Sequence, residues 1–318
     1  MKEAIRIATR GSRLALAQTN QMAASLRAAH PALEVLIETF RTAGDRDRAA
    51  PLAHLPGIGF FVRELQAALL DDRVDLAVHS LKDVPTAVPG GLEVCATVPE
   101  REDPRECLVT VAGLALADLP EGATVGTSSP RRRAMLASVR RDLRFTDLRG
   151  NVETRLSRLA AGVCGATVLA RAGLARLGML DERMAVLEPK AMLPPAGQGA
   201  LGLEFRAADE RVRRVIAPLD HGPSRLAVVA ERAVVHRLGA GCRTPLGVLG
   251  RVDASGRLVL DAWILSVDGR RGIREQVSGA AAGAARLGVM LAEALLAAGA
   301  ERFLAADGGA YQNGAADA

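Results

Sequence analysis

Residues 124–133 read Thr-Val-Gly-Thr-Ser-Ser-Pro-Arg-Arg-Arg, the pattern of a strand that leads directly into a helix. Residues 124–126 predict the strand, Ser129 is a candidate N-cap, and Pro130 stands at the first helical position, where proline is favoured. The order repeats downstream, where a predicted strand over residues 143–148 leads to Asn151, a second candidate cap. Strands that alternate with helices in this way predict α/β lobes with mostly parallel sheets and helices on both faces.

The same region is strongly basic. Residues 124–158 hold nine arginines and three acidic residues, a local charge of +6, whereas the whole chain carries only +5. Open α/β sheets bind ligands at the C-terminal ends of their strands, and helix N-termini favour anions there. Two arginine-bearing turns in equivalent places, with Arg149 at the start of the second, therefore predict an anion site. A solvated basic face is the alternative reading.

Composition excludes several classes of protein. The 318 residues, 49% of them hydrophobic, predict two or three packed domains. There is no apolar run long enough for a membrane span and no signal-like N-terminus, so a cytoplasmic protein is expected. The four cysteines show no C-x-x-C pairing, so no metal site is expected. Aromatic residues at 3% are too few for a base-stacking platform, which argues against a nucleic-acid partner despite a pI near 9.5.

Two proline-containing polar stretches divide the chain. Residues 99–104 and 193–200 are predicted crossings between lobes. The expected domains are an α/β lobe 1 over residues 1–98 and 199–217, an α/β lobe 2 over residues 99–198, and a smaller α+β domain over residues 218–318, with a frayed tail at 307–318. The Gly-x-Gly-x-x-Gly pattern at 197–202 precedes a predicted strand instead of following one, so it is not a dinucleotide site.

Three further features have both a functional and a structural reading. Lys82 and Asp83 follow a predicted strand and would suit a zwitterionic ligand, or they form an ordinary surface ion pair. Cys242 lies in a glycine-rich loop before Arg243, which suits a reactive thiol, although cysteines are more often small buried hydrophobes. The polar stretch at 41–56 is either a flap or a plain surface loop.

Nine motifs in order resemble the hydroxymethylbilane synthase family, whose members are also called porphobilinogen deaminases. They include Ile-Ala-Thr-Arg-Gly-Ser at residues 7–12, Ala-Val-His-Ser-Leu-Lys-Asp-Val-Pro at 77–85 and Val-Gly-Thr-Ser-Ser-Pro-Arg-Arg at 125–132. The others are at residues 100–104, 148–152, 155, 169–174, 197–200 and 241–242. Together they span nearly the whole chain.

The resemblance implies a three-domain fold with two lobes of the periplasmic-binding-protein type and a cleft between them. It implies a transferase of tetrapyrrole and haem biosynthesis that joins four porphobilinogen molecules head to tail, releases ammonia at each step, and frees linear hydroxymethylbilane by hydrolysis. It also implies a dipyrromethane cofactor bound through a thioether to Cys242, and a monomer. Every pyrrole ring carries an acetate and a propionate, so an arginine-lined cleft suits the growing chain. Asp83 would stabilise the cation left when ammonia departs.

The resemblance assigns the other site residues in groups. Asp83 and Lys82 would be catalytic. The cofactor would be bound by Lys82, Thr127, Ser128, Ser129, Arg131, Arg132, Gly150 and Gly199. The substrate and the growing chain would be bound by Arg10, Ser12, Gln18, Phe61, Arg149, Asn151, Arg155 and Gln198. Ile58 stands where the family commonly has lysine, so it is left out of the site. A non-catalytic, two-lobed anion-binding protein is the main alternative.

Overall fold

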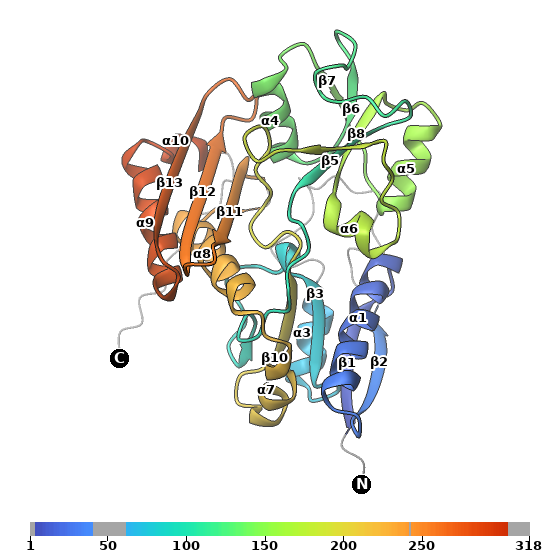
Figure 1. Cartoon of the computed structure of the whole chain (residues 1–318), viewed down its shortest axis with the longest axis vertical. Coiled ribbons are helices and arrows are strands. Elements are labelled where there is room, and N and C mark those ends of the chain that lie inside the picture. Colours follow the sequence, from blue (N-terminus) through green and yellow to red (C-terminus); the bar gives the residue numbers. More distant parts are fainter. Residues whose placement is uncertain (1–3, 41–61, 242, 305–318) are drawn as a thin grey trace.

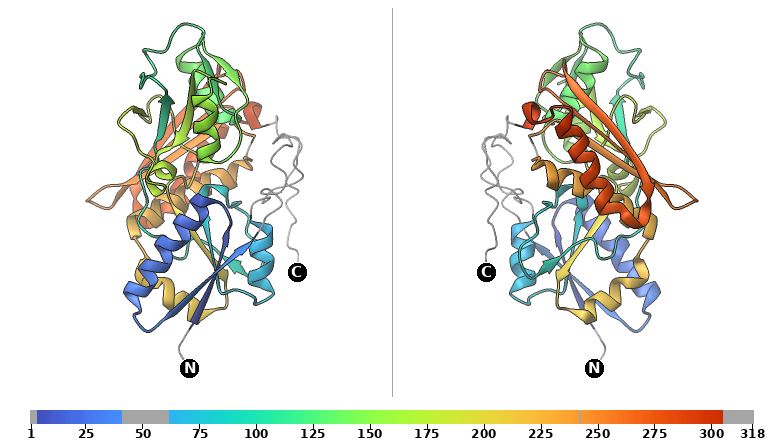
Figure 2. Two further views of the ribbon diagram at one scale, coloured as in Figure 1. Left: turned by 90° about the vertical axis from the view of Figure 1, so that its right-hand side faces the viewer. Right: turned by 90° about the vertical axis from the view of Figure 1, so that its left-hand side faces the viewer.

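A computed structural model describes residues 4–40, 62–241 and 243–304, and within these ranges the strands form three sheets (Figure 1). Two five-stranded sheets form lobes 1 and 2, and a three-stranded antiparallel sheet forms a smaller third domain. The two lobes follow one another along the long axis of the molecule, and the third domain lies beside them (Figures 1 and 2). The predicted fold class is confirmed, whereas the exact domain boundaries stay predictions.

Lobe 1 has the strand order β2-β1-β3-β10-β4, in which β10 alone runs antiparallel to its neighbours. Alternate residues of β1 face opposite layers of helices: Ile5 and Ile7 pack with α1 and α7, and Ala8 packs with α3. The elements of lobe 1 are β1 (Ala4–Arg10), α1 (Arg13–Ala29), β2 (Glu34–Phe40), α3 (Arg63–Leu70), β3 (Leu76–Ser80), the 3₁₀ turn η2 (Leu81–Asp83), β4 (Leu92–Glu93), β10 (Leu201–Arg206), α7 (Glu210–Ile216) and η3 (Ala217–Leu219).

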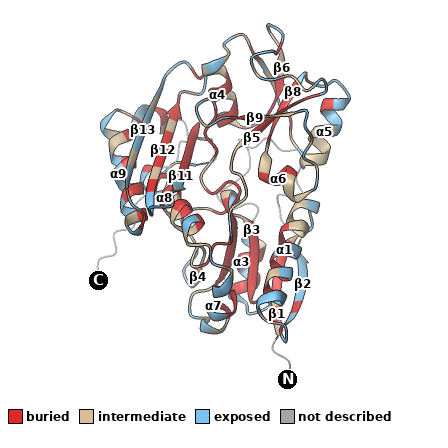
Figure 3. Ribbon diagram, in the orientation of Figure 1, coloured by how far each residue is buried: buried red, intermediate tan, exposed pale blue. Residues whose placement is uncertain are grey.

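Lobe 2 repeats this topology as β7-β6-β8-β5-β9, with β5 as the antiparallel strand. Helix α4 packs on one face of the sheet, and α5 and α6 pack on the other. Buried residues concentrate along the strands of both lobes (Figure 3). The elements of lobe 2 are β5 (Glu106–Thr110), β6 (Thr124–Gly126), α4 (Pro130–Val139), β7 (Arg144–Thr146), α5 (Val152–Ala160), β8 (Ala166–Ala170), α6 (Arg171–Arg176) and β9 (Met184–Leu187).

The chain crosses between the lobes twice, and the two crossings touch. The backbone N–H of Glu102 in the first crossing donates to the carbonyl of Gly199 in the second at 3.3 Å. Gly199 has φ +86°, and a Cβ added there would lie 2.3 Å from the Glu102 carbonyl oxygen, so only glycine fits. Each crossing leads directly into the antiparallel strand of a lobe. The first crossing leads into β5 of lobe 2, and the second leads into β10 of lobe 1.

The third domain begins with a long helix and packs two helices against its sheet. Its core includes Val234, Leu260 and Leu291. The helix α8 ends at Gly239, which adopts the left-handed conformation with φ +60°. The elements are α8 (Gly222–Leu238), β11 (Leu246–Val252), β12 (Arg257–Leu265), β13 (Gly272–Ala280), η4 (Ala281–Gly283), α9 (Ala284–Ala297) and α10 (Glu301–Leu304).

A buried carboxylate ties the third domain to both crossings. Glu231 of α8 pairs with Arg101 of the first crossing through two hydrogen bonds of 2.6 and 3.1 Å. The same carboxylate accepts from the backbone N–H of Gly197 in the second crossing and of Gly250 in β11, both at 2.7 Å. The junction of the three units is therefore fixed by one charged side chain whose acceptors are satisfied.

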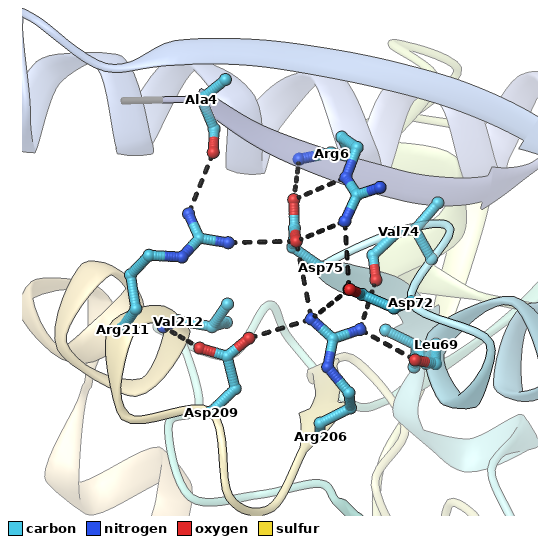
Figure 4. Close-up of polar contacts among 10 residues, drawn as sticks. All are labelled: Ala4, Arg6, Leu69, Asp72, Val74, Asp75, Arg206, Asp209, Arg211 and Val212. Atoms are coloured by element: carbon cyan, nitrogen blue, oxygen red, sulfur yellow. Dashed lines mark hydrogen bonds and ion pairs between the residues drawn. The ribbon is translucent and has the colours of Figure 1, made fainter. Parts of the chain in front are cut away.

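A second ion cluster closes the far end of lobe 1, at the N-terminal ends of β1 and β3 (Figure 4). The carboxylate of Asp75 accepts from the backbone and guanidinium of Arg6, at 2.7 to 3.1 Å. Arg211 lies 3.0 Å from Asp75, and Arg206 donates to Asp209 at 2.9 Å. These contacts join the segment β10–α7, in which the chain comes back to lobe 1, to β1 and to the start of β3.

Some strands differ from what the sequence predicts. β13 was not expected because Ile273 and Val277, on its half-buried side, are its only large apolar residues. β9 was also missed. The strand predicted over residues 143–148 is present but shorter, as β7 covers Arg144–Thr146. The expected flap at 41–56 and the expected frayed tail lie outside the described residues.

Candidate functional site

The turn between β6 and α4 is built as the sequence predicted. Ser129 caps the helix, and its Oγ accepts from the backbone N–H of Arg132 at 3.4 Å. Thr127 is buried, and its Oγ1 accepts from the backbone N–H of Ser129 at 3.2 Å. The Oγ of Ser128 is buried and has no hydrogen-bond partner among the described residues. A buried hydroxyl of this kind at a helix start is suited to a ligand oxygen.

Arg131 and Arg132 follow in the first turn of α4, and both guanidinium groups are buried. They share one carboxylate, that of Glu106 at the start of β5. Arg132 donates to it through Nε at 3.1 Å and through Nη2 at 2.8 Å, and Arg131 donates through Nη2. Arg131 also donates to the carbonyl of Leu193 at 2.6 Å. The two arginines predicted to bind the cofactor are therefore held as a pair.

The turn between β7 and α5 supplies the second cationic group. Gly150 has φ +114°, and a Cβ added there would lie 2.7 Å from Thr154, so the turn requires glycine. Asn151 caps α5 by accepting from the N–H of Thr154 at 2.9 Å. Arg155 donates from Nε to the carbonyl of Gly150 at 2.9 Å. Burial, with the nearby charge of Arg132, lowers the pKa of Arg155 to about 10.

Lobe 1 contributes Lys82 and Asp83 on the 3₁₀ turn η2, directly after β3. Lys82 Nζ donates to Oε1 of Gln198 at 3.1 Å, and the Nε2 of that glutamine donates to the carbonyl of Pro104 at 2.7 Å. Burial lowers the pKa of Lys82, and Asp83 opposes the shift while Arg132 adds to it. Asp83 is exposed, so its carboxylate is accessible to a ligand.

Charged side chains of the two lobes meet at one place. Arg132 and Glu106 of lobe 2 influence the pKa of Lys82 in lobe 1, and Asp83 of lobe 1 influences the pKa of Arg155 in lobe 2. Because β6, β7 and β8 are parallel neighbours, their C-terminal turns meet at one edge of the lobe 2 sheet. The structure thus brings together the predicted residues Lys82 and Asp83 with the arginines of both turns.

Two of the residues predicted to bind substrate also have structural roles. Ser12 caps α1, accepting from the N–H of Ala15 at 3.2 Å. Gln18 is buried, and its amide exchanges hydrogen bonds of 2.9 and 3.2 Å with Ser80, the last residue of β3. Their assignment to the substrate stays a prediction, as do those of Arg10 and Arg149. Phe61 and Cys242 lie outside the described residues.

Three residues near the site were missed. Glu106 looked like an ordinary strand residue. Arg232 of α8 donates to the carbonyls of Val84 and Pro85, at 2.9 and 2.7 Å, directly after Asp83. Arg176 donates to the carbonyl of Gly199 at 2.7 Å, and burial lowers its pKa to about 10. The one available signal for Glu106 was a charged residue directly before the apolar residues 107–109, because a charge is almost never buried unless it is paired.

The described part of the chain holds neither a membrane-spanning helix nor a cluster of metal ligands. None of its helices combines the length and apolarity that a membrane span needs. Within the same residues, histidine, cysteine, aspartate and glutamate side chains nowhere gather in threes with the placement of metal ligands.

Comparison with known proteins gives consistent matches over both parts of the chain. The family model described as porphobilinogen deaminase, dipyromethane cofactor binding domain, matches residues 5–214. The model of the porphobilinogen deaminase C-terminal domain matches residues 225–297. Among solved structures, the BenM effector binding domain with its effector benzoate covers 67% of this chain and 88% of that chain, at 14% identity and a TM-score of 0.42, which is only a loose likeness.

Curated relatives match along nearly their full length. The porphobilinogen deaminase of Roseiflexus castenholzii is 47% identical over 305 residues, covering 96% of this chain and 100% of its own. That of Desulforudis audaxviator is 47% identical over 306 residues, covering 96% and 98%. That of Syntrophobacter fumaroxidans is 44% identical over 300 residues, covering 94% and 96%. With both family models matched and relatives this similar over their whole length, the chain belongs to the porphobilinogen deaminase family.

Proposed function

We propose that the chain is a hydroxymethylbilane synthase that works at the edge where lobe 1 presents Asp83 and lobe 2 presents its arginines. Its substrate is porphobilinogen, four molecules of which are joined with loss of ammonia before the linear product is released by water. One observation supports the residue assignment. The exposed carboxylate of Asp83 and the ammonium group of Lys82, both in lobe 1, lie near Arg132 and Arg155 of lobe 2. We further propose that the enzyme is monomeric and cytoplasmic and has no nucleic-acid partner.

The residues at the start of α4 fit a dipyrromethane cofactor, which carries four carboxylates. The buried, unpartnered Oγ of Ser128 is one donor for such a group. Arg132 uses Nε and Nη2 for Glu106, which leaves Nη1 for a ligand carboxylate. When bound through the sulfur of Cys242, the dipyrromethane supplies the pyrrole end to which new rings are added. Lys82, Thr127, Ser129, Arg131, Gly150 and Gly199 complete the proposed cofactor site.

The chain's own side chains then divide the work. Carboxylates and rings of the incoming substrate and the growing chain are bound by Arg149 and Arg155 at the second turn. The other residues of this substrate site are Arg10, Ser12, Gln18, Phe61, Asn151 and Gln198. Asp83 accepts hydrogen bonds from pyrrole N–H groups and stabilises the positive charge that develops as ammonia leaves. Lys82, whose pKa is lowered by burial, is placed to exchange a proton beside that carboxylate.

The decisive test is the intact mass of the denatured protein. Wild-type protein purified after normal folding is expected to exceed the sequence mass by two pyrrole units, because a thioether survives denaturation. Cys242→Ala is expected to have the unmodified mass and no synthase activity. Cys164→Ala, which removes a buried thiol from the lobe 2 core, is the matched control and is expected to keep the added mass. An unmodified, inactive wild-type protein would instead favour a non-catalytic anion binder.

A further inference from the structure

Glu106 occupies an unusual place for a carboxylate. It is the first residue of β5, reached directly from the first crossing, and none of its surface is exposed. Its two oxygens accept three hydrogen bonds from Arg131 and Arg132. Burial alone would raise the pKa of Glu106, but the charges of Arg132 and Arg131 outweigh it and hold that pKa well below its usual range. At neutral pH the carboxylate is therefore the negatively charged partner of both arginines.

The fold itself does not require an ion group at this place. In lobe 1, β10 takes the place that β5 has in lobe 2. The first residue of β10 is Leu201, which pairs with the last residue of β3. In the same way, Glu106 pairs with the last residue of β8. Helix α1 corresponds to α4, and after its cap it carries Leu14 and Ala15 in the places of Arg131 and Arg132. The positions in lobe 1 that correspond to this ion group are thus apolar.

Charge balance explains why lobe 2 differs. Two adjacent guanidinium groups, each largely removed from water, repel one another unless an anion lies between them. Lys82 adds a third positive charge close enough to influence Glu106. Before any ligand carboxylate arrives, Glu106 is the anion that these cations share, and it fixes the direction in which each guanidinium points.

We infer that Glu106 is a positioning residue that holds Arg131 and Arg132 as a preformed pair for the carboxylates of the dipyrromethane. This inference depends on the proposed function. A preformed donor pair binds its ligand without the cost of ordering two long side chains at that moment. Glu106 therefore acts on cofactor loading through the arginines, and it need not touch cofactor or substrate.

The test measures cofactor loading directly, by mass. Full-length apoprotein is made in cells that produce no porphobilinogen, porphobilinogen is added, and the gain of two pyrrole units is followed by intact-mass spectrometry. Glu106→Gln keeps the size and removes the charge, and it is expected to load about tenfold more slowly than wild type because the arginine pair is no longer held. Glu106→Asp keeps the charge and is expected to load within about threefold of wild type.

Glu204→Gln is the matched control. Glu204 is an equally buried carboxylate on β10, where it contacts His79 at 2.9 Å and Gln66 at 2.8 Å instead of the arginine pair. This variant is expected to lose stability but to load at the wild-type rate. The inference is overturned if Glu106→Gln loads as fast as Glu204→Gln, or if Glu106→Asp is as slow as Glu106→Gln.

If the Glu106→Gln apoprotein does not fold, refolding from urea with and without porphobilinogen decides the question. Recovery of folded, loaded protein only with porphobilinogen supports the inference, because ligand carboxylates then replace the missing charge. Failure to recover under both conditions overturns it, because the carboxylate would be needed by the fold alone. A wild-type apoprotein that gains no mass would contradict the proposed function itself, which separates the two failures.

Discussion

Each lobe buries a carboxylate among arginines, but at opposite ends of the same sheet topology. In lobe 1, Asp75 lies at the N-terminal ends of β1 and β3, where it binds Arg6 and Arg211 (Figure 4). In lobe 2, Glu106 lies at the edge where β6 and β8 end, where it binds Arg131 and Arg132. Ligands of open α/β sheets bind at that second edge. The same ion chemistry therefore closes the sheet in lobe 1 and prepares a ligand site in lobe 2.

The lobes also divide the charges at the site. Lobe 1 presents the exposed carboxylate of Asp83, and lobe 2 presents mainly cations, with its own carboxylate buried beneath them. A polyanionic chain would thus be bound chiefly by lobe 2, while the positive charge of the reacting ring would be met by lobe 1. This division predicts that binding and turnover can be separated by mutation.

The largest effect is expected from Asp83→Asn. The turnover number should fall about 100-fold to 1,000-fold, because a fixed carboxylate that faces developing positive charge is lost. The KM for porphobilinogen should change little, because the arginines of lobe 2 are untouched. Steady-state kinetics on fully loaded enzyme measures both constants. Near-normal turnover would remove Asp83 from its role, and Asp181→Asn, at an exposed ion pair of lobe 2, controls for the loss of a surface charge.

Asp75→Asn tests whether the lobe 1 cluster is structural only. The free energy of unfolding at pH 7 should fall by about 2 kcal/mol, less than for a fully buried pair because Arg6 and Arg211 stay partly exposed. Urea unfolding gives this value, and intact mass should show cofactor loading at the wild-type rate. Loading as slow as that expected of Glu106→Gln would break the distinction between the two clusters.

The pH dependence of this effect has a definite sign. Burial raises the pKa of Asp75, but hydrogen bonds from Arg6 and the nearby charges lower it more, so it lies below the ordinary value near 4 in the folded protein. A depressed pKa contributes stability above the ordinary value and loses it as the pH falls through the folded-state pKa. The difference between wild type and Asp75→Asn should be constant from pH 7 to pH 5 and shrink below about pH 4. A difference that grew on acidification would contradict this assignment.

Local interactions could be predicted from the sequence, and buried long-range ones could not. Ser129 and Asn151 were both correctly predicted as caps, because a cap involves only the next three residues. The pairing of Glu106 with Arg131, 25 residues away, depends on how β5 enters the sheet beside α4. The two arginine-bearing turns were predicted to meet at one edge, but their counter-ion Glu106 was not identified.

The same limit explains why Arg232 was missed. It lies 148 residues from Val84 along the chain, on α8, the first helix of the third domain. Its role depends on the third domain lying against lobe 1, which follows from the path of the chain through both crossings. By contrast, Lys82 and Asp83 could be singled out because they directly follow a buried strand, where functional residues of α/β folds concentrate.

The smallest effect tests how the third domain contacts each lobe. Arg232 donates to two carbonyls of lobe 1, at Val84 and Pro85, and Arg274 donates to two carbonyls of lobe 2, at Lys190 and Pro189. Arg232→Met should lower turnover about tenfold with little change in KM, because the turn that orients Asp83 is loosened. Arg274→Met removes a similar contact from a segment without a proposed catalytic group, together with the ion pair of Arg274 with Asp261 inside the third domain. Its turnover should stay within about twofold of wild type. Both variants are compared as fully loaded enzyme by steady-state kinetics. Equal losses of turnover in the two variants would mean that the third domain supports general stability, and that Arg232 does not position the carboxylate.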